Sequence, residues 1–321
     1  MTKFKTEGLR VVIAGGSRGL GKCLAMELAK RGAHILLLAR GKGNLEVAKA
    51  EVLSCRKSPE QVVDAIATDL CDYSGVKDAL KQFGVVPDIV FCVAGGSNPS
   101  QIGFLADLSP EGLTSCLESN YYSAIFVTQI CLQLWIHKPS PDRTRHVVFV
   151  SSAAAFVGLP GYIAYTPPKA AIRAFADTLR QELLLYGGTD AYQVHSAFPG
   201  AFITDSFLAE QASKPEITKI MEGSNISDEN LQETVPSALT IAKKILVGLD
   251  KGYFSITSDW ESALILNNMR GPSPPDNLLL DIFLAFIAFL AWPFIRRDFD
   301  RKTSNYGRRN RANLLSGHSE I

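Results

Sequence analysis

The stretch that decides the fold is RVVIAGGSRGLG, residues 10–21, in which an apolar run ends in a glycine-rich turn. A segment of helical period, Leu20–Arg31, follows directly. The glycines have the spacing G-x-x-x-G-x-G, which lets the backbone come close to a pyrophosphate, while the helix N-terminus supplies N–H donors and a positive dipole. The turn therefore predicts a dinucleotide site that uses Gly15, Ser17, Arg18, Gly19 and Gly21.

Apolar runs of strand type alternate with helical segments over most of the chain. The runs are Arg10–Ala14, Ala33–Ala39, Val62–Ala67, Asp88–Val93, His146–Val150, Tyr192–Phe198 and, more weakly, Tyr253–Ile256. Nearly continuous apolar strands are typical of a parallel sheet that is covered by helices on both faces. We therefore expect an α/β fold with a doubly wound parallel sheet, the Rossmann fold, over residues 1–260.

The residue after the second apolar run predicts which dinucleotide is bound. Sites that prefer NAD usually place an acidic residue there, against the ribose hydroxyls. Here the run ends at Ala39-Arg40, and no carboxylate occurs before Glu46. Arg40 and Arg18 could flank a 2′-phosphate, because the planar guanidinium fork suits phosphate, although both could also be ordinary surface arginines. We expect NADPH as the cofactor, with Ala94 and Gly95, at the end of the fourth run, passing the nicotinamide ribose.

A tyrosine and a lysine in the arrangement Y-x-x-x-K, Tyr165 and Lys169, supply the chemistry. Residues four apart share one face of a helix. A tyrosine hydroxyl with a pKa of about 10 is a poor acid–base group at neutral pH, and a nearby ammonium is expected to lower that pKa. Tyr165 could then give a proton to a carbonyl oxygen as hydride arrives.

Two more polar residues complete the expected catalytic set. Ser152, at the end of an expected strand 146–152, could bond the substrate oxygen, and Asn120, on an expected long helix Gly112–Ile136, could hold a water that relays protons to Lys169. Pro167 and Pro168 are interpreted as the first turn of a helix, where proline is tolerated. No spacing typical of a metal site accompanies the six cysteines, so no metal is expected.

Together these motifs resemble the short-chain dehydrogenases/reductases over roughly Leu9 to Ile256. The resemblance implies that Asp69-Leu70 contacts the adenine ring, although a helix N-cap at Asp69 would explain the same sequence. It also implies that Pro199 and Thr204, in the segment PGAFIT, border the nicotinamide. Two positions depart from the family, because Ala14 and Val93 replace the usual Thr and Asn. We interpret them as a compensating pair on neighbouring strands.

Within that family the chain most resembles the fungal branch that reduces 3-ketodihydrosphingosine. The features that carry this are GGSRGLG, Arg40, the approach SSAAAFVGLPGYIAY to Tyr165, and an apolar C-terminal segment. The resemblance implies NADPH-dependent reduction of a long-chain sphingoid ketone to dihydrosphingosine, at the cytosolic face of the endoplasmic reticulum. Two alternatives stay open, a reductase of another apolar ketone (steroid, retinoid or 3-ketoacyl) and a non-catalytic NADPH-binding scaffold.

Residues 261–321 have a different character and predict a membrane-associated segment. After the breaker Arg270–Asn277, the stretch Leu278–Ile295 is apolar except for Asp281, and a basic tail follows. Eighteen helical residues span about 27 Å, slightly less than a hydrocarbon core. A single span would leave the basic tail in the lumen, against the positive-inside tendency. We therefore expect a re-entrant or interfacial segment in contact with membrane lipid.

The N-terminal sequence and the net charge limit the location and the partners that we expect. The N-terminal MTKFKTEGLR has no apolar core of a signal peptide, so the catalytic domain is expected to face the cytosol. A net charge of +1 gives no reason to expect nucleic acid. A homo-oligomer is compatible with the sequence.

Overall fold

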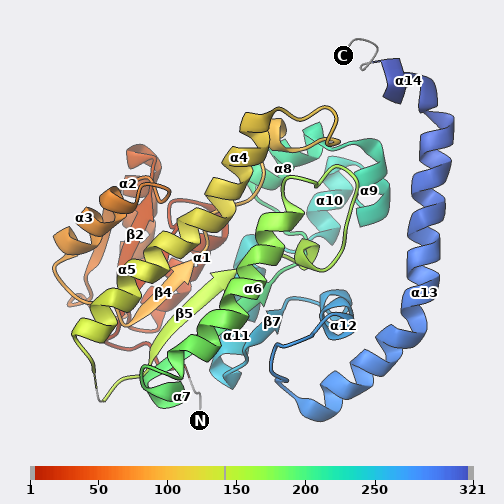
Figure 1. Ribbon diagram of the computed structural model, residues 1–321. Coiled ribbons are helices and arrows are strands. Elements are labelled where there is room, and N and C mark those ends of the chain that lie inside the picture. The colour runs from red at the N-terminus through yellow and green to blue at the C-terminus, as the bar shows by residue number, and fades with distance from the viewer. Residues whose placement is uncertain (1–3, 141, 317–321) are drawn as a thin grey trace.

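The computed structural model describes residues 4–140 and 142–316, and its centre is a seven-stranded parallel sheet in the order β3-β2-β1-β4-β5-β6-β7. The strands are β1 (Arg10–Ala14), β2 (His34–Ala39), β3 (Val63–Ala67), β4 (Ile89–Cys92), β5 (Arg145–Val150), β6 (Tyr192–Phe198) and β7 (Ser255–Thr257). Helices cover both faces of this sheet (Figure 1). The doubly wound fold is confirmed, and each expected strand lies within about two residues of its position.

The helices follow the strands in alternation. They are α1 (Gly19–Lys30), α2 (Lys42–Ser54), α3 (Tyr73–Phe83), α4 (Pro110–Leu117), α5 (Ser123–His137), α6 (Thr166–Leu183), α7 (Gly188–Ala191), α8 (Asp205–Ser213), α9 (Glu216–Glu222), α10 (Asp228–Thr234), α11 (Ala238–Lys251), α12 (Trp260–Asn268), α13 (Leu278–Arg309) and α14 (Arg311–Ser316). Short turns η1 (Pro99–Gln101), η2 (Glu118–Tyr122) and η3 (Ala153–Ala155) complete the set. The element order places the carboxyl ends of all strands at one edge, where α/β folds bind their ligands.

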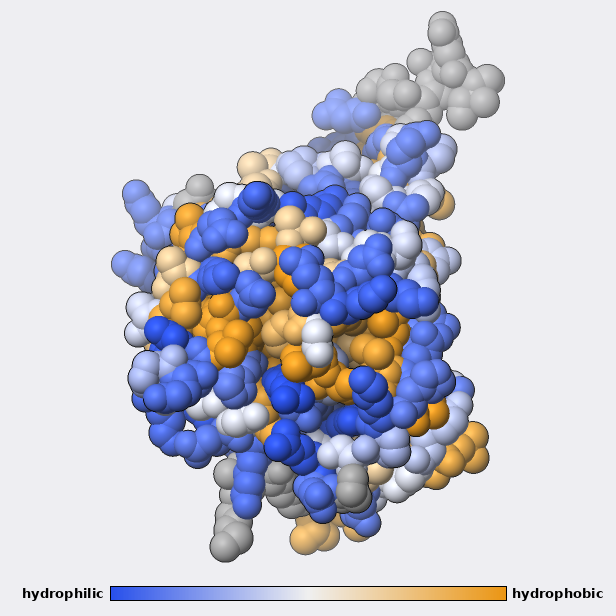
Figure 2. Space-filling model, turned by 90° about the vertical axis from the view of Figure 1, so that its left-hand side faces the viewer, coloured by the Kyte–Doolittle hydropathy of each residue, from blue (hydrophilic) through white to orange (hydrophobic). Residues whose placement is uncertain are grey.

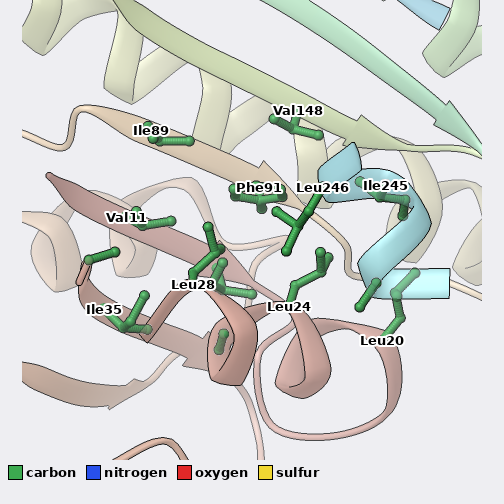
Figure 3. Packing of buried hydrophobic residues seen from close by; sticks show 14 of the residues in the cluster. Val11, Leu20, Leu24, Leu28, Ile35, Ile89, Phe91, Val148, Ile245 and Leu246 are labelled. Carbon is green, nitrogen blue, oxygen red and sulfur yellow. The ribbon is translucent and has the colours of Figure 1, made fainter. Parts of the chain in front are cut away.

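Burial of apolar strands explains why the sheet forms. On one face, α1 inserts Leu20, Leu24 and Leu28 against Val11 and Phe91 of neighbouring strands, and α11 adds Ile245 and Leu246 (Figure 3). On the other face, α3, α5 and α6 cover the alternate residues of the same strands. Full burial of each such side chain stabilises the fold by roughly 1.5–3 kcal/mol. Strands that have no solvent-exposed face therefore have an uninterrupted apolar sequence, and this pattern is what predicted them.

The expected long helix Gly112–Ile136 is wrong in one respect, because it is interrupted at Asn120. A π-helical turn, η2, separates α4 from α5. A π-turn accommodates one extra residue in the helical ladder and often marks a functional site. The expected strand through Ser152 is also too long, since β5 ends at Val150 and Ser152 instead caps η3 by accepting a hydrogen bond from Ala154 N.

The proline interpretation is confirmed. Helix α6 begins at Thr166, and Pro167 and Pro168 occupy its first turn, directly after Tyr165. Their missing N–H groups remove no helical hydrogen bond, because the first-turn donors have no partner within a helix. Tyr165 therefore stands at the mouth of the helix, and Lys169 lies one turn further along.

The C-terminal region is one continuous helix, α13, of 32 residues that runs past Pro293 into the basic tail. It contains no chain reversal, so the re-entrant form of the expected segment is wrong, whereas an interfacial position is compatible with it. Its first turn is fixed to the body by Asp281, whose carboxylate pairs with Arg270 at 2.8 Å and accepts from Asp276 N at 2.8 Å. Figure 1 shows α13 along one side of the molecule, beyond α9 and α12.

The outward face of α13 is strongly apolar and exposed. Within the described residues, α13 is the one helix long and apolar enough to span a membrane, and 11% of its apolar window is buried. Phe283, Phe286 and Phe289 are 58%, 59% and 73% exposed. The face shown in Figure 2, on the side of α2 and α3, differs because hydrophilic side chains interrupt its apolar patches. A contiguous exposed apolar stripe marks an interaction surface for lipid or protein.

Candidate active site

The glycine-rich turn packs against the end of β4. Gly15 has φ +95°, and a Cβ added to it would stand 2.5 Å from Ala94 N. A Cβ on Gly21 would overlap the carbonyl oxygen of Gly15. Only glycine fits both positions, so the turn remains narrow and its backbone stays accessible to a ligand. Gly15, Gly19, Gly21 and Ala94 are thus brought to one place, at the edge where β1 and β4 diverge.

The two departures from the family pattern are neighbours. Val93 N donates to Ala14 O at 2.9 Å, and Ala94 N donates to the same oxygen at 2.8 Å. The backbone contact between β1 and β4 therefore persists without the polar side chains usual at these positions. The expectation that they lie on adjacent strands is confirmed.

The second and third strands deliver the residues expected around the adenine end. Arg18 precedes α1 and Arg40 follows β2, and both side chains are exposed. Neither guanidinium has a hydrogen-bond or ion-pair partner among the described residues, which leaves both available to an anion. Asp69 accepts from Cys71 N at 3.0 Å, and the N-cap of α3 is Asp72 instead. The alternative interpretation of Asp69 as that helix cap is therefore wrong, and Leu70 beside it is buried.

Tyr165, Lys169 and Ser152 converge at the carboxyl end of β5. Lys169 Nζ donates to Val150 O at 3.2 Å and lies 5.6 Å from the centre of the Tyr165 ring. The Ser152 hydroxyl lies close enough to the Tyr165 phenol to lower its pKa. Pro199 O accepts from Ala153 N at 2.9 Å, so the segment after β6 borders the same place. The three residues can contact a single small group.

Asn120 and Gly95 adjoin this set from the β4 side. Asn120 Oδ1 accepts from Gly96 N at 2.8 Å, and its Nδ2 donates to Gly96 O at 2.7 Å. A Cβ on Gly95 would stand 2.5 Å from Asn120 Oδ1 and 3.2 Å from Lys169 Nζ. The π-turn that carries Asn120 therefore places its amide next to Lys169, with Gly95 between them.

The pKa values define the protonation states of the set. Burial raises the pKa of Tyr165, and the charge of Glu210 raises it further, while the nearby Ser152 hydroxyl lowers it. The expected net lowering by Lys169 is wrong, because burial outweighs the other effects. Burial also lowers the pKa of Lys169 to about 8. Tyr165 is thus a neutral phenol at physiological pH, the form that can give a proton to a carbonyl.

Thr204, from the segment after β6, lies over the glycine turn. Its Cγ2 is 3.3 Å from the position of a Cβ on Gly19, and its hydroxyl accepts from Phe207 N at 3.1 Å to cap α8. From the sequence alone, the apolar residues Phe202 and Phe207 of this segment would predict a flap over the site. Phe202 packs against the core instead, and Phe207 faces the ammonium of Lys214 at 4.9 Å.

Four residues near the site are not evident from sequence motifs. Lys214 pairs with Glu210 at 2.9 Å and with Glu222 at 2.8 Å, and Tyr162 donates its hydroxyl hydrogen to Glu210. The sequence signal that could have found them is Lys214, a lysine close to the apolar residues Phe207 and Leu208. A buried lysine in such a segment requires a carboxylate partner.

A glycine turn at a Rossmann edge, next to a partly buried Tyr–Lys–Ser set, defines a nicotinamide-dependent oxidoreductase. A family model described as short chain dehydrogenase matches residues 10–215. The chain belongs to this family.

Three relatives that carry a designation match between 70% and 94% of the chain. A 3-ketodihydrosphingosine reductase of Debaryomyces hansenii is 31% identical, with 91% of this chain and 87% of the relative covered. A fusion protein of Schizosaccharomyces pombe, designated PIGF/3-ketodihydrosphingosine reductase, is 32% identical over 94% of this chain, which spans 58% of its length. A 3-dehydrosphinganine reductase of Danio rerio is 35% identical over 70% of this chain and 66% of its own.

Solved structures agree on the fold. A short-chain dehydrogenase/reductase of Burkholderia phymatum, in complex with NAD, aligns with a TM-score of 0.68 over 85% of this chain and 99% of its own, at 18% identity. Identity at this level supports the architecture alone.

Proposed function

We propose that this protein reduces 3-ketodihydrosphingosine to dihydrosphingosine with NADPH, as the catalytic step of a membrane-associated enzyme. The observation that carries the chemistry is the convergence of Tyr165, Lys169 and Ser152 beside the glycine turn. The observation that favours the substrate is the near full-length similarity to reductases of that designation, including the Debaryomyces hansenii relative.

The residues divide the work of reduction. NADPH, when bound, supplies the hydride. Ser152 and Tyr165 bond the ketone oxygen, and Tyr165 donates its phenolic proton as the alkoxide develops. Lys169 holds positive charge close to the ring and favours the phenolate that is left behind. Asn120, one contact away, holds the water through which Lys169 and Tyr165 regain a proton.

The cofactor preference rests on two arginines and a glycine cradle. The close approach of Gly15 to Ala94 leaves backbone, and no side chain, where a pyrophosphate would lie. Gly19, Gly21, Ser17 and the start of α1 supply N–H donors there. Arg18 and Arg40 are exposed, have no hydrogen-bond or ion-pair partner in the described part of the chain, and can hold a 2′-phosphate. Asp69 and Leu70 border the adenine, and Gly95, Pro199 and Thr204 border the nicotinamide.

Membrane association assigns a role to the C-terminal region. Residues 1–260 form the catalytic unit and residues 261–321, of which 317–321 lie outside the described part, form the membrane-associated segment with its basic tail. The two are joined through α12, where Leu266 packs against Phe156 and Phe198. A cavity of about 530 Å³ separates α13 from the loop Phe156–Pro160 that leads to Tyr165. An interfacial α13 on the cytosolic face of the endoplasmic reticulum would hold this loop near lipid.

The test is NADPH oxidation by the detergent-solubilised full chain with a long-chain 3-keto sphingoid base. Steroid, retinoid and 3-ketoacyl ketones serve as the comparison panel. Turnover with the sphingoid ketone, lost in a Tyr165→Phe variant, is expected. Preferential turnover of another ketone would assign that substrate instead, and NADPH binding without turnover of any ketone would indicate a non-catalytic protein.

A further inference from the structure

A buried charged group lies in the segment after β6, beside the active site. Lys214, whose side chain is 1% exposed, pairs with Glu210 and Glu222, which are 15% and 19% exposed. Because two carboxylates pair with a single ammonium, the group retains one negative charge that no positive charge in the group compensates. Burying an uncompensated charge is costly, and such a charge is retained where a further partner or a function requires it.

Glu210 is bonded to residues that adjoin the catalytic set. One carboxylate oxygen accepts from the Tyr162 hydroxyl, and the other accepts from Ser97 Oγ at 2.7 Å. The ring centre of Tyr162 is 5.5 Å from that of Tyr165. Ser97 directly follows Gly96, which Asn120 holds. Glu210 therefore bridges the two walls of the site, the end of β4 and the loop before the proton donor.

The segment that carries Glu210 is attached firmly to the catalytic loop. Thr218 Oγ1 donates to Pro160 O at 2.6 Å. A Cβ on Gly161 would overlap Thr218 Oγ1 and approach Pro215 to 3.2 Å, so the two surfaces are in close contact. Helices α8 and α9 lie together beside the end of the sheet in Figure 1. The position of the carboxylate is thus fixed relative to Tyr165 by packing on both sides.

A second polar side chain, Gln211, has no hydrogen-bond partner among the residues that the structure describes. Gln211 is 4% exposed, and within the described residues neither its amide nitrogen nor its amide oxygen makes a hydrogen bond. Gln211 follows Phe207 by four residues, so the two share one face of α8. Lys214, the C-cap of α8, comes three residues after Gln211. Lys214 and Phe207 contact each other at 4.9 Å, so Gln211 adjoins the charged group. A buried amide without a partner is costly, and a polar ligand would satisfy it.

We propose that Glu210 binds the ammonium group of the sphingoid substrate, with Gln211 accepting or donating a hydrogen bond to the same polar head. The inference rests on the proposed function. In a 3-keto sphingoid base the amine is on the carbon next to the ketone. A ketone oxygen at Tyr165 therefore brings the ammonium to the wall that Glu210 forms. Steroid, retinoid and 3-ketoacyl ketones have no such amine, so Glu210 selects among apolar ketones by charge.

The test compares two ketones that differ only in the amine. The NADPH-loaded full chain is assayed in detergent with a long-chain 3-keto sphingoid base and with the 1-hydroxy-3-ketone of equal length. The variant is Glu210→Gln, and the control is Glu216→Gln, an exposed carboxylate at the start of α9. A hydrogen bond to a charged group contributes about 1.5–3 kcal/mol, so Glu210→Gln should lower the preference for the amine, measured as the ratio of kcat/KM values, by at least about tenfold.

The loss is expected in KM for the amine, whereas Glu216→Gln should leave the ratio unchanged. An equal loss of kcat/KM on both ketones would show that the role of Glu210 is merely structural. Unchanged kcat/KM values on both ketones would mean that the ammonium binds elsewhere. Either result overturns the proposal. If Glu210→Gln does not fold, judged by thermal unfolding with NADPH, Glu210→Asp gives the same comparison, because its carboxylate is withdrawn by one methylene.

A binding measurement separates this proposal from the proposed function. If the unaltered protein reduces neither ketone, the proposed function fails. Calorimetric titration with dihydrosphingosine and with the matched diol that lacks the amine still decides the role of Glu210. Binding of the amine that is weakened selectively by Glu210→Gln supports the subsite, and equal affinity for both ligands overturns it.

Discussion

Asn120 is bonded to both polar atoms of the Gly96 backbone, with its Oδ1 accepting from the N–H and its Nδ2 donating to the carbonyl. This double contact fixes the chain where β4 meets the catalytic set. The adjoining Gly95 has φ +137°, and a Cβ there would stand 2.5 Å from Asn120 Oδ1.

Gly95→Ala should therefore abolish activity and lower the melting temperature. The added methyl requires a strained backbone and displaces Asn120 or Lys169, with a cost of at least about 1–3 kcal/mol. Thermal unfolding and NADPH oxidation measure the two effects. Gly43→Ala in α2 is the control, because a Cβ there meets nothing within 4 Å, and it should be neutral or slightly stabilising. Similar behaviour of both variants would contradict the close contact.

Tyr165→Phe should reduce turnover by at least about a hundredfold, the low end for acid–base catalysis, while NADPH binding is retained. The ring still packs, and only the proton donor is lost. Steady-state kinetics and fluorescence titration with NADPH measure the two properties. Tyr186→Phe, at an exposed position, is the control. Near-normal turnover of the Tyr165 variant would mean that another group protonates the ketone.

Arg40→Asp should weaken NADPH selectively. The carboxylate repels a 2′-phosphate, and loss of a charge-assisted contact of about 1.5–3 kcal/mol corresponds to at least about tenfold in affinity. The dissociation constants for NADPH and NADH are compared in the unaltered protein and the variant. Arg309→Asp makes the same charge change near the end of α13 and should have no effect. Equal affinity of the unaltered protein for both cofactors would contradict the preference.

Acid should destabilise the fold through two buried histidines. His195 donates from Nδ1 to Tyr253 O, and its Nε2 lies 3.0 Å from His146 Nδ1. Burial lowers the pKa of His146 to about 3 and that of His195 to about 4. The unfolded chain takes up protons below about pH 6.5, whereas the folded chain does not. Stability contributed by the neutral pair is complete above that pH and is lost as the pH falls towards the folded values.

At about pH 5, each buried histidine should lower the free energy of unfolding by roughly 2 kcal/mol relative to its value at neutral pH. Urea unfolding at a series of pH values measures this. His137→Gln, at an exposed histidine, should leave the pH dependence unchanged, and His195→Gln should reduce it. A stability that stays constant from neutral pH to about pH 5 would mean that the folded and unfolded chains take up protons equally, so that the fold does not lower the pKa values of the pair.

Membrane binding should depend on the outward face of α13. Replacement of Phe283, Phe286 and Phe289 by Gln removes apolar side chains that contribute roughly 1.5–3 kcal/mol each when buried in lipid, so vesicle affinity should fall at least about a hundredfold. Cosedimentation with vesicles measures it. Leu185→Gln, an exposed apolar residue after α6, is the control. Unchanged cosedimentation of the triple variant would show that this face does not contact lipid.

The strands and the catalytic motifs could be predicted because their signals are local. A run such as Val11–Ala14 is apolar at every position since both its faces are buried. The spacing of Tyr165 and Lys169 follows from one helical turn. The spacing of residues within such a motif can be found in a sequence even when the fold is unknown.

The features of the fold and the site that could not be predicted depend on contacts between residues that are distant in the sequence. One extra residue in the π-turn at Asn120 leaves no mark on the apolar pattern of the flanking helices. The pairing of Tyr162 with Glu210 joins segments 48 residues apart. The direction of the Tyr165 pKa was mistaken because spacing shows the nearby lysine but not the burial that outweighs it.

The exposed stripe on α13 would also alter how the rate of this enzyme depends on concentration. A protein held on a bilayer and a ketone dissolved in the same bilayer meet by diffusion in two dimensions. The velocity then follows the mole fraction of ketone in the lipid. Addition of inert phospholipid would slow the reaction at constant total amounts of enzyme and ketone, and the triple phenylalanine variant would lose that dependence.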